Sequence, residues 1–170
     1  MYKIIYFLVL PFTYIYAVEP TLAILYNVNS NETQKFNIGN YNFYCSPYGV
    51  TSLETLYKRS KSDSLCKKSI DRFYVKNPDL KYFSDGILHL TQRYHIDFKE
   101  GKCVVYANGE LSLSELLLKN GLAILNPKFD DEEFSYRFKN SELEAKFSKK
   151  GLWGTTIHKD CISEMLAKEL

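Results

Sequence analysis

The sequence lacks an excess of charge of either sign. Its 170 residues carry 22 lysines and arginines against 20 aspartates and glutamates, which gives a formal net charge of +2. Binding of nucleic acid without sequence preference depends on clustered basic residues, and the chain has no long basic run. The composition therefore favours a protein over a nucleic acid as the main partner.

The chain also lacks an apolar run long enough to cross a membrane comfortably. Residues 4–18 are almost wholly apolar, but a helix of this length extends only about 22 Å, against roughly 30 Å for a bilayer core. Lys3, this apolar run and Ile15-Tyr16-Ala17 are together typical of a secretory signal. We expect residues 1–17 to be a signal peptide of an exported, periplasmic or secreted protein. The alternative is a short uncleaved anchor, with residues 1–18 in the inner membrane.

No two cysteines have the C-x-x-C spacing, so a zinc site or a thioredoxin-like redox motif is poorly supported. An even number of cysteines in an exported chain favours disulfides. The candidates are Cys45, Cys66, Cys103 and Cys161. We expect Cys45 to pair with Cys66, because this bond would tie a strand to the next helix; free buried thiols are the alternative.

The order of apolar patterns predicts strands first, with helices around and after them. This order defines an α+β class. One domain is expected over residues 18–155, followed by a C-terminal helical extension over residues 156–170. Strands are predicted at residues 21–28, 93–98, 103–106 and 122–125, and residues 36–45 are predicted to form two strands joined by a turn at Gly39-Asn40. Helices are predicted at residues 53–57, 65–74, 112–120 and 134–150.

Several local signals fix the ends of the later helices. Ser112 and Glu115 form a capping box, and Gly121 closes that helix at a position that tolerates positive φ. The acidic run of residues 130–133 is expected to start the next helix, favoured by the helix dipole, rather than to bind a metal. Gly151 stops this helix, and Trp153 is expected to fill the core. The predicted buried side of the helix and its end comprises Phe134, Phe138, Ala145 and Leu152.

Three motifs follow one another between Cys103 and Trp153. They are Val105-Tyr106-Ala107-Asn108-Gly109, then Glu115-Leu116-Leu117 through Asn120-Gly121-Leu122-Ala123, then Ser141-Glu142-Leu143-Glu144-Ala145-Lys146 through Gly151-Leu152-Trp153. In order and spacing they resemble the C-terminal half of the staphylococcal-nuclease (thermonuclease) family. The residues that carry this signature are Gly109, Gly121, Glu142, Ala145, Gly151 and Trp153. The resemblance implies an OB-type five-stranded β-barrel with packed helices.

The resemblance also implies a chemistry that this chain departs from. Family members cleave phosphodiesters with calcium, which needs oxygen ligands from aspartates, and they use two arginines to clamp the phosphate. Here no aspartate occurs between Glu19 and Ser62, and Asn27-Val28-Asn29-Ser30 stands where the metal turn belongs. No arginine precedes Arg59. The fold is therefore expected to be retained and the family's active site to be lost.

Two residues remain as stand-ins for the family's catalytic groups. Lys102, in Glu100-Gly101-Lys102, matches the position of one arginine, but lysine lacks the planar guanidinium fork. Glu54 is the only counterpart of the catalytic glutamate and lies several residues late. Both are candidate catalytic residues only if the chain is a nuclease.

Three functions stay open on the sequence. The first is a non-catalytic nuclease-like domain that acts in the cell envelope as a protein-interaction or assembly (chaperone-type) module. The second is an exported calcium-dependent nuclease with a rearranged site. The third is a single-strand nucleic-acid binder, since 14 tyrosines and 11 phenylalanines could stack on bases or contact a protein. No cofactor or metal is expected except calcium under the second, and a membrane contact only through an uncleaved N-terminal segment.

Overall fold

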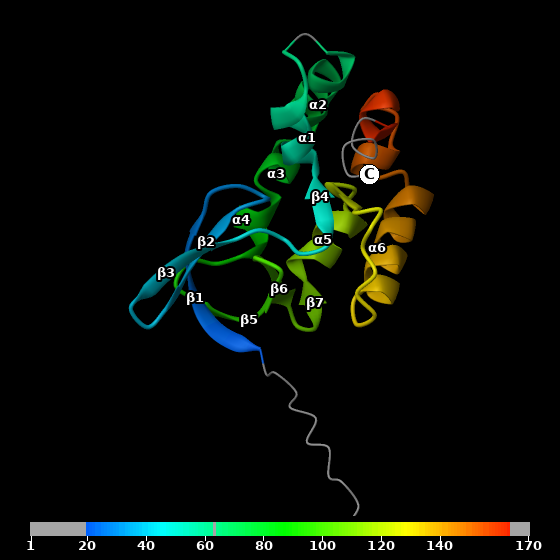
Figure 1. The fold of residues 1–170 in the computed structure, drawn as a ribbon. Helices are drawn as coiled ribbons and strands as arrows, with labels where there is room; N and C mark the ends of the chain where they lie inside the picture. The colour runs from blue at the N-terminus through cyan, green and yellow to red at the C-terminus, as the bar shows by residue number, and fades with distance from the viewer. Residues whose placement is uncertain (1–19, 63, 164–170) are drawn as a thin grey trace, which may run out of the picture.

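A computed structural model describes residues 20–62 and 64–163 of the chain (Figure 1). The predicted signal peptide lies outside the described residues, and so do residues 164–170 of the predicted C-terminal extension. Within the described part, no helix is both long and apolar enough to span a membrane. The strands gather on one side of the molecule, with α1 and α2 at one end and α6 on the opposite side from the β2–β3 hairpin (Figure 1).

Most strands form one antiparallel sheet with the order β3-β2-β1-β5-β6-β7. A separate two-stranded sheet pairs β4 with β8. The strands are β1 (Thr21–Val28), β2 (Gln34–Ile38), β3 (Tyr41–Cys45), β4 (Val50–Ser52), β5 (Arg93–Lys99), β6 (Lys102–Asn108), β7 (Leu111–Ser112) and β8 (Ala123–Leu125).

Helices lie at three places in the chain: between β4 and β5, between β7 and β8, and after β8. They are α1 (Leu53–Arg59), α2 (Leu65–Lys76), α3 (Pro78–Lys81), α4 (Phe83–Ile87), α5 (Leu113–Lys119), α6 (Ser135–Phe147) and the 3₁₀ helix η1 (Gly151–Trp153). Residues 160–163 are also helical. The α+β class and the predicted order of elements are confirmed.

The strands alternate between a buried and an exposed face. Leu25 in β1 lies opposite Phe36 in β2, and both are fully buried. Ala23 and Ile96, on β1 and β5, continue this inner face at 1% exposure each. Leu22, on the other face of β1, is 50% exposed. This alternation follows from the two-residue period of a strand with one face on the core.

The predicted capping box of α5 is confirmed. The Glu115 backbone N–H donates to the Ser112 hydroxyl at 3.2 Å, and the Ser112 N–H donates to the Glu115 carboxylate at 2.8 Å. The same carboxylate is almost fully buried and is held by Arg137 of α6 at 2.9 Å. The Asp131 carboxylate accepts from the Glu133 N–H at 2.9 Å in the turn before α6. The helix itself begins at Ser135 without a side-chain cap, and its first turn holds no acidic residue, so the acidic run lies before the helix rather than in its first turn. Phe134, Phe138, Ala145 and Leu152 are all buried, as expected.

The predicted Cys45–Cys66 disulfide is wrong. Cys45 is bonded to Cys103, and Cys66 to Cys161. Cys45 ends β3, and the chain beyond it runs beside the start of β6, so the two sulfurs meet there. Cys66, in the first turn of α2, instead contacts the C-terminal segment. All four cysteines are paired, which also excludes the free-thiol alternative and fits an oxidising, exported environment.

The expected closed five-stranded barrel is not seen as a continuous strand ladder within the described residues. The sheet has two ends, β3 and β7. Beyond β3, Pro47 forms a single parallel bridge with Cys103 of β6. Around this bridge the Cys103 N–H donates to the Ser46 carbonyl at 2.9 Å, and the Tyr48 N–H donates to the Cys103 carbonyl at 3.0 Å. The structure therefore establishes a mostly antiparallel sheet. Its end strand β3 is tied to β6 by the Cys45–Cys103 disulfide and by one bridge from the residues that follow β3.

Candidate functional site

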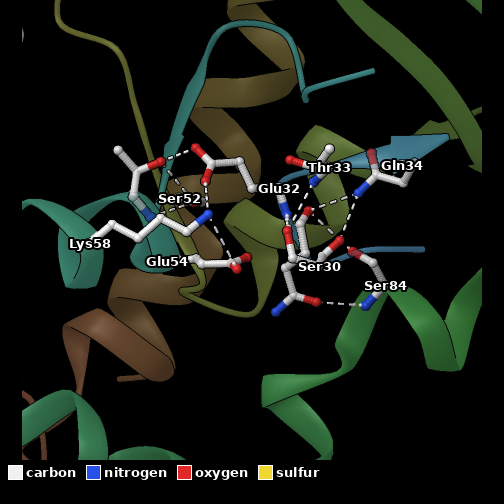
Figure 2. A network of polar contacts seen from close by, with 10 residues as sticks. Ser30, Glu32, Thr33, Gln34, Ser52, Glu54, Lys58 and Ser84 are labelled. Carbon is white, nitrogen blue, oxygen red and sulfur yellow. Dashed lines mark hydrogen bonds and ion pairs between the residues drawn. The ribbon is translucent and has the colours of Figure 1, made fainter. Parts of the chain in front are cut away.

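The turn between β1 and β2 is held in one conformation by its own side chains. The Ser30 hydroxyl accepts from the backbone N–H groups of Glu32 and Thr33 at 3.2 Å each. The side-chain amide of Gln34, which is fully buried, donates to the carbonyls of Ser30 and Asn31 at 3.0 and 3.1 Å. These bonds fix the direction of the residues at the tip of the turn (Figure 2).

Asn31 ties this turn to the helices below it. Its side-chain amide donates to the Leu80 carbonyl at 2.9 Å, and its side-chain oxygen accepts from the Ser84 N–H at 2.8 Å. Asn31 is 4% exposed. The sequence Asn31-Glu32-Thr33 is an acceptor pattern for N-linked glycans, and burial makes this amide inaccessible in the folded chain.

Next to the buried asparagine, Glu32 reaches across to α1. Its carboxylate accepts from the Thr55 hydroxyl and from the Lys58 ammonium, the latter at 3.3 Å. Lys58 also lies 3.5 Å from the Glu54 carboxylate, one turn earlier in α1. Ser52 positions this end of the helix as its N-cap by accepting from the Thr55 N–H at 3.0 Å. Figure 2 shows the Lys58 ammonium between the two carboxylates.

Lys58 offsets part of the negative charge of this cluster. Partial burial lowers the pKa of the Lys58 ammonium, but the carboxylates of Glu54 and Glu32 outweigh this effect, so its pKa is raised overall. The ammonium is therefore charged at neutral pH. It neutralises one of the two carboxylate charges and lies within 3.5 Å of both carboxylates.

The donor set at the turn does not fit the calcium ion that the nuclease resemblance implies. Calcium takes six to eight oxygen ligands, with several carboxylates among them. Here Glu32 and Glu54 are the two carboxylates of the cluster, and both are engaged by Lys58. Among residues 20–62 and 64–163, no group of three or more His, Cys, Asp or Glu side chains could hold a metal ion.

A cleft of about 850 Å³ opens beside this cluster, between the β1–β2 turn and helices α1, α2 and α3. Three tyrosines and a valine give it a largely apolar lining, and Tyr82 and Val75 are 63% and 82% exposed. Its complete lining consists of Asn29, Ser30, Glu54, Tyr57, Lys58, Asp71, Tyr74, Val75, Pro78, Lys81 and Tyr82. The cleft therefore offers aromatic surface with polar groups at its margin.

Two of these tyrosines are protonated over the whole neutral range. A hydrogen bond to Asp71, with a smaller effect of burial, raises the pKa of the Tyr57 hydroxyl. Burial, with a smaller effect of the Glu54 charge, raises the pKa of the Tyr74 hydroxyl. Both rings are thus neutral surfaces for packing, and the Tyr57 ring already stacks under the Lys67 ammonium at 4.6 Å.

The structure separates the two candidate catalytic residues from each other. Glu54 lines the cleft, as does Ser30 at the place of the family's metal turn. Lys102 pairs with Lys99 across the β5–β6 hairpin and is not among the residues that line the cleft. Sequence reasoning missed Glu32, because a carboxylate was sought within residues 27–30 and Glu32 lies two residues later in the chain. It also missed Lys58, although its spacing of four residues from Glu54 is a recognisable helical ion pair.

No known protein family matches this chain by its sequence model, and no curated protein matches it either. The function is therefore argued from the geometry of the cleft and of the cluster beside it.

Replacing Lys58 with methionine tests whether its ammonium balances the two carboxylates. We expect the change in the free energy of unfolding to stay below about 1 kcal/mol, since exposed ion pairs contribute little. We expect calcium to bind the variant weakly, with a dissociation constant near 10⁻³ M, and the unchanged chain more weakly still. Competition of calcium against terbium, with luminescence sensitised by the cleft tyrosines, measures both affinities.

The matched control is the variant that also carries Glu32→Gln and Glu54→Gln, which should not bind terbium at the cluster. Equal calcium affinity in the unchanged chain and in Lys58→Met would contradict the role assigned to the ammonium.

Proposed function

We propose that the chain is a non-catalytic nuclease-like domain of an exported protein, which binds a segment of a partner protein in the cleft between the β1–β2 turn and helices α1 to α3. The observation that carries this proposal is the cleft itself. It combines about 850 Å³ of volume with three tyrosines and an exposed valine. Tyrosine is enriched where proteins contact one another.

The proposed relationship to the nuclease family is supported by contacts between its signature residues. Gly121, after α5, and Gly151, in η1, touch through their backbones: the Leu152 N–H donates to the Gly121 carbonyl at 2.9 Å. The Glu142 carboxylate accepts from the Leu125 N–H at 3.0 Å and so joins α6 to β8. The separated motifs thus form one packed unit.

An OB-type barrel belongs to the same proposal. In such a barrel the third strand closes against the last one, and here the chain that continues β3 bridges to β6 in parallel. The Cys45–Cys103 disulfide lies at this closure. Both features support a barrel in which the short pairing between the chain after β3 and β6 is reinforced by a disulfide.

Loss of catalysis is supported by the charges in the cleft. Phosphodiester cleavage needs positive groups on the developing negative charge. Of the two cations that line the cleft, Lys58 is paired with two carboxylates, and Lys81 lies 5.7 Å from the centre of the Tyr82 ring. No arginine is among the lining residues.

One observation favours the single-strand binder as a second candidate. On the outer face of the sheet, Lys35 lies opposite Tyr44 of β3, and its ammonium is 5.3 Å from the centre of the Tyr26 ring. Arg93 and His95 of β5 are exposed on the same face. Steep weakening of oligonucleotide affinity with rising salt would favour this candidate over the protein-binding module.

Cleavage of single- and double-stranded DNA and RNA, with calcium and with chelator, tests the loss of catalysis. We expect no calcium-dependent cleavage by the folded chain. Cleavage that the double variant Glu54→Gln, Lys102→Ala abolishes would overturn the proposal and establish a rearranged nuclease site.

Site-specific photo-crosslinking tests the binding role. A benzophenone amino acid at Val75, on the cleft, should trap one predominant protein in the cell envelope. The matched position is Tyr136, which is 76% exposed on α6 and lies outside the cleft. The same set of proteins trapped from both positions would contradict a specific role for the cleft.

A further inference from the structure

We infer that the free edge of β3 pairs with the β3 edge of a second copy of this chain, so that two copies share one continuous sheet. β3 is the end strand of the six-stranded sheet. In Figure 1 the β2–β3 hairpin projects from the side of the molecule away from α6, so helices do not cover it. This inference is independent of the cleft.

The hydrogen-bonding direction of each β3 residue follows from the ladder with β2. A two-residue turn, Gly39-Asn40, joins the strands and leaves Ile38 opposite Tyr41. In a hairpin of this kind the pair next to the turn exchanges backbone hydrogen bonds, and every second pair does so after it. The backbone groups of Asn42 and Tyr44 therefore point away from β2.

The bridge beyond β3 supports this assignment independently. Ser46 is two residues after Tyr44 and four after Asn42, so its backbone groups are expected to point in the same direction as theirs. Its carbonyl accepts from the Cys103 N–H of β6 at 2.9 Å. β6 thus occupies the edge beside Ser46 only. In the described part of the chain, no backbone hydrogen bond outside the β2–β3 ladder reaches Asn42 or Tyr44.

The β3 edge also lacks the devices that normally prevent strand pairing. Natural edge strands carry charged residues, proline or a bulge. The sequence Tyr41-Asn42-Phe43-Tyr44-Cys45 has neither a charge nor a proline, and its register with β2 is regular. The strand and its surroundings expose large aromatic side chains: Tyr41 and Tyr44 of β3 are 80% and 61% exposed, and Phe98 of β5 is 54% exposed. The ring of Phe98 lies 5.1 Å from that of Phe43.

A second copy fits this edge because the strand is complementary to itself. With a two-fold axis at Phe43, Asn42 of each copy lies opposite Tyr44 of the other. These two pairs form about four backbone hydrogen bonds, and the two Phe43 side chains meet at the axis. A closed two-fold contact of this kind repeats one patch on both partners. The uncharged strand brings no like charges together, and the small net charge of the chain adds little repulsion.

Sedimentation equilibrium of the exported chain, with both disulfides intact, tests the dimer from micromolar to sub-millimolar concentration. We expect a reversible dimer with a micromolar dissociation constant. The double variant Asn42→Lys, Tyr44→Lys places lysines opposite lysines across the dimer contact, so its dissociation constant should rise about tenfold or more. The lysine introduced at position 44 would also lie opposite Lys35 of β2 within each monomer. Its melting curve establishes that the monomer is folded.

Two further samples make the test specific. Mixing the lysine variant with Asn42→Glu, Tyr44→Glu should restore a mixed dimer, because opposite charges then face each other. Tyr136→Lys, Phe147→Lys adds the same charge on exposed positions of α6 and should dimerise normally. A chain that stays monomeric throughout, a dimer indifferent to the edge lysines, or folded variants that fail to form the mixed dimer would each overturn the inference.

Discussion

Gly121→Ala should destabilise the chain by about 3–5 kcal/mol, which combines backbone strain with a steric clash. Gly121 has φ +63°, a left-handed conformation that favours glycine. A Cβ atom there would lie 2.2 Å from the Lys150 carbonyl oxygen and 2.7 Å from its carbon. Both are backbone atoms of the segment that ends α6, so a rotamer change cannot relieve the contact. Urea unfolding followed by circular dichroism measures the loss.

The control for this prediction is Gly109→Ala. Gly109 has almost the same conformation, φ +60°, but a Cβ atom there meets nothing within 4 Å. We expect a loss of only about 1–2 kcal/mol, the strain of a left-handed alanine. The difference between the two variants isolates the close contact of Gly121 with residues 150–151. Equal losses would show that this contact does not constrain the fold.

Removal of the Cys45–Cys103 disulfide should cost about 4 kcal/mol. The bond joins residues 58 apart in the sequence, and a cross-link of this span strongly reduces the conformational entropy of the unfolded chain. It also lies at the only described bridge between the chain after β3 and β6, so we expect that edge to open first. Urea unfolding of Cys45→Ser, Cys103→Ser measures the effect.

Two further measurements test this prediction. Peptide mapping without reductant should yield Cys45 with Cys103 and Cys66 with Cys161; a Cys45–Cys66 peptide would contradict the structure. Hydrogen exchange of the double variant should show its largest increase in β3 and in residues 46–48. An increase confined to the C-terminal segment, which the other disulfide holds, would contradict a local role for Cys45–Cys103.

The elements that short stretches of sequence control were largely predictable. Alternation around Gly39-Asn40 predicted the β2–β3 hairpin, and Ser112 and Glu115 predicted the start of α5. Each depends on residues within four positions of one another, where backbone preference and local hydrogen bonds decide the conformation. The predicted core positions Phe134 and Phe138 were right for the same reason, since helical spacing puts them on one face.

The candidate site was only half predictable. Glu54 was named in the sequence only as the counterpart of the nuclease family's catalytic glutamate, and the structure places it beside the cleft. Glu32 joins it only because Asn31 is anchored to Leu80 and Ser84, some fifty residues away. The cleft tyrosines come from three separate segments: Tyr57 from α1, Tyr74 from α2 and Tyr82 from the junction of α3 and α4. No spacing rule connects these segments, since their contact depends on how the helices pack against the β1–β2 turn.

The sequence by itself determined the α+β class, the order of strands and helices, and an even set of cysteines that favours disulfides. Only the tertiary structure decided which cysteines pair, how Lys58 comes to neutralise Glu32, where the cleft opens and which strand edge is free. The physical reason is the separation along the sequence over which each effect acts. Propensity, capping and periodicity act over a few residues, whereas pairing, burial and charge balance depend on distances between residues that are far apart in the chain.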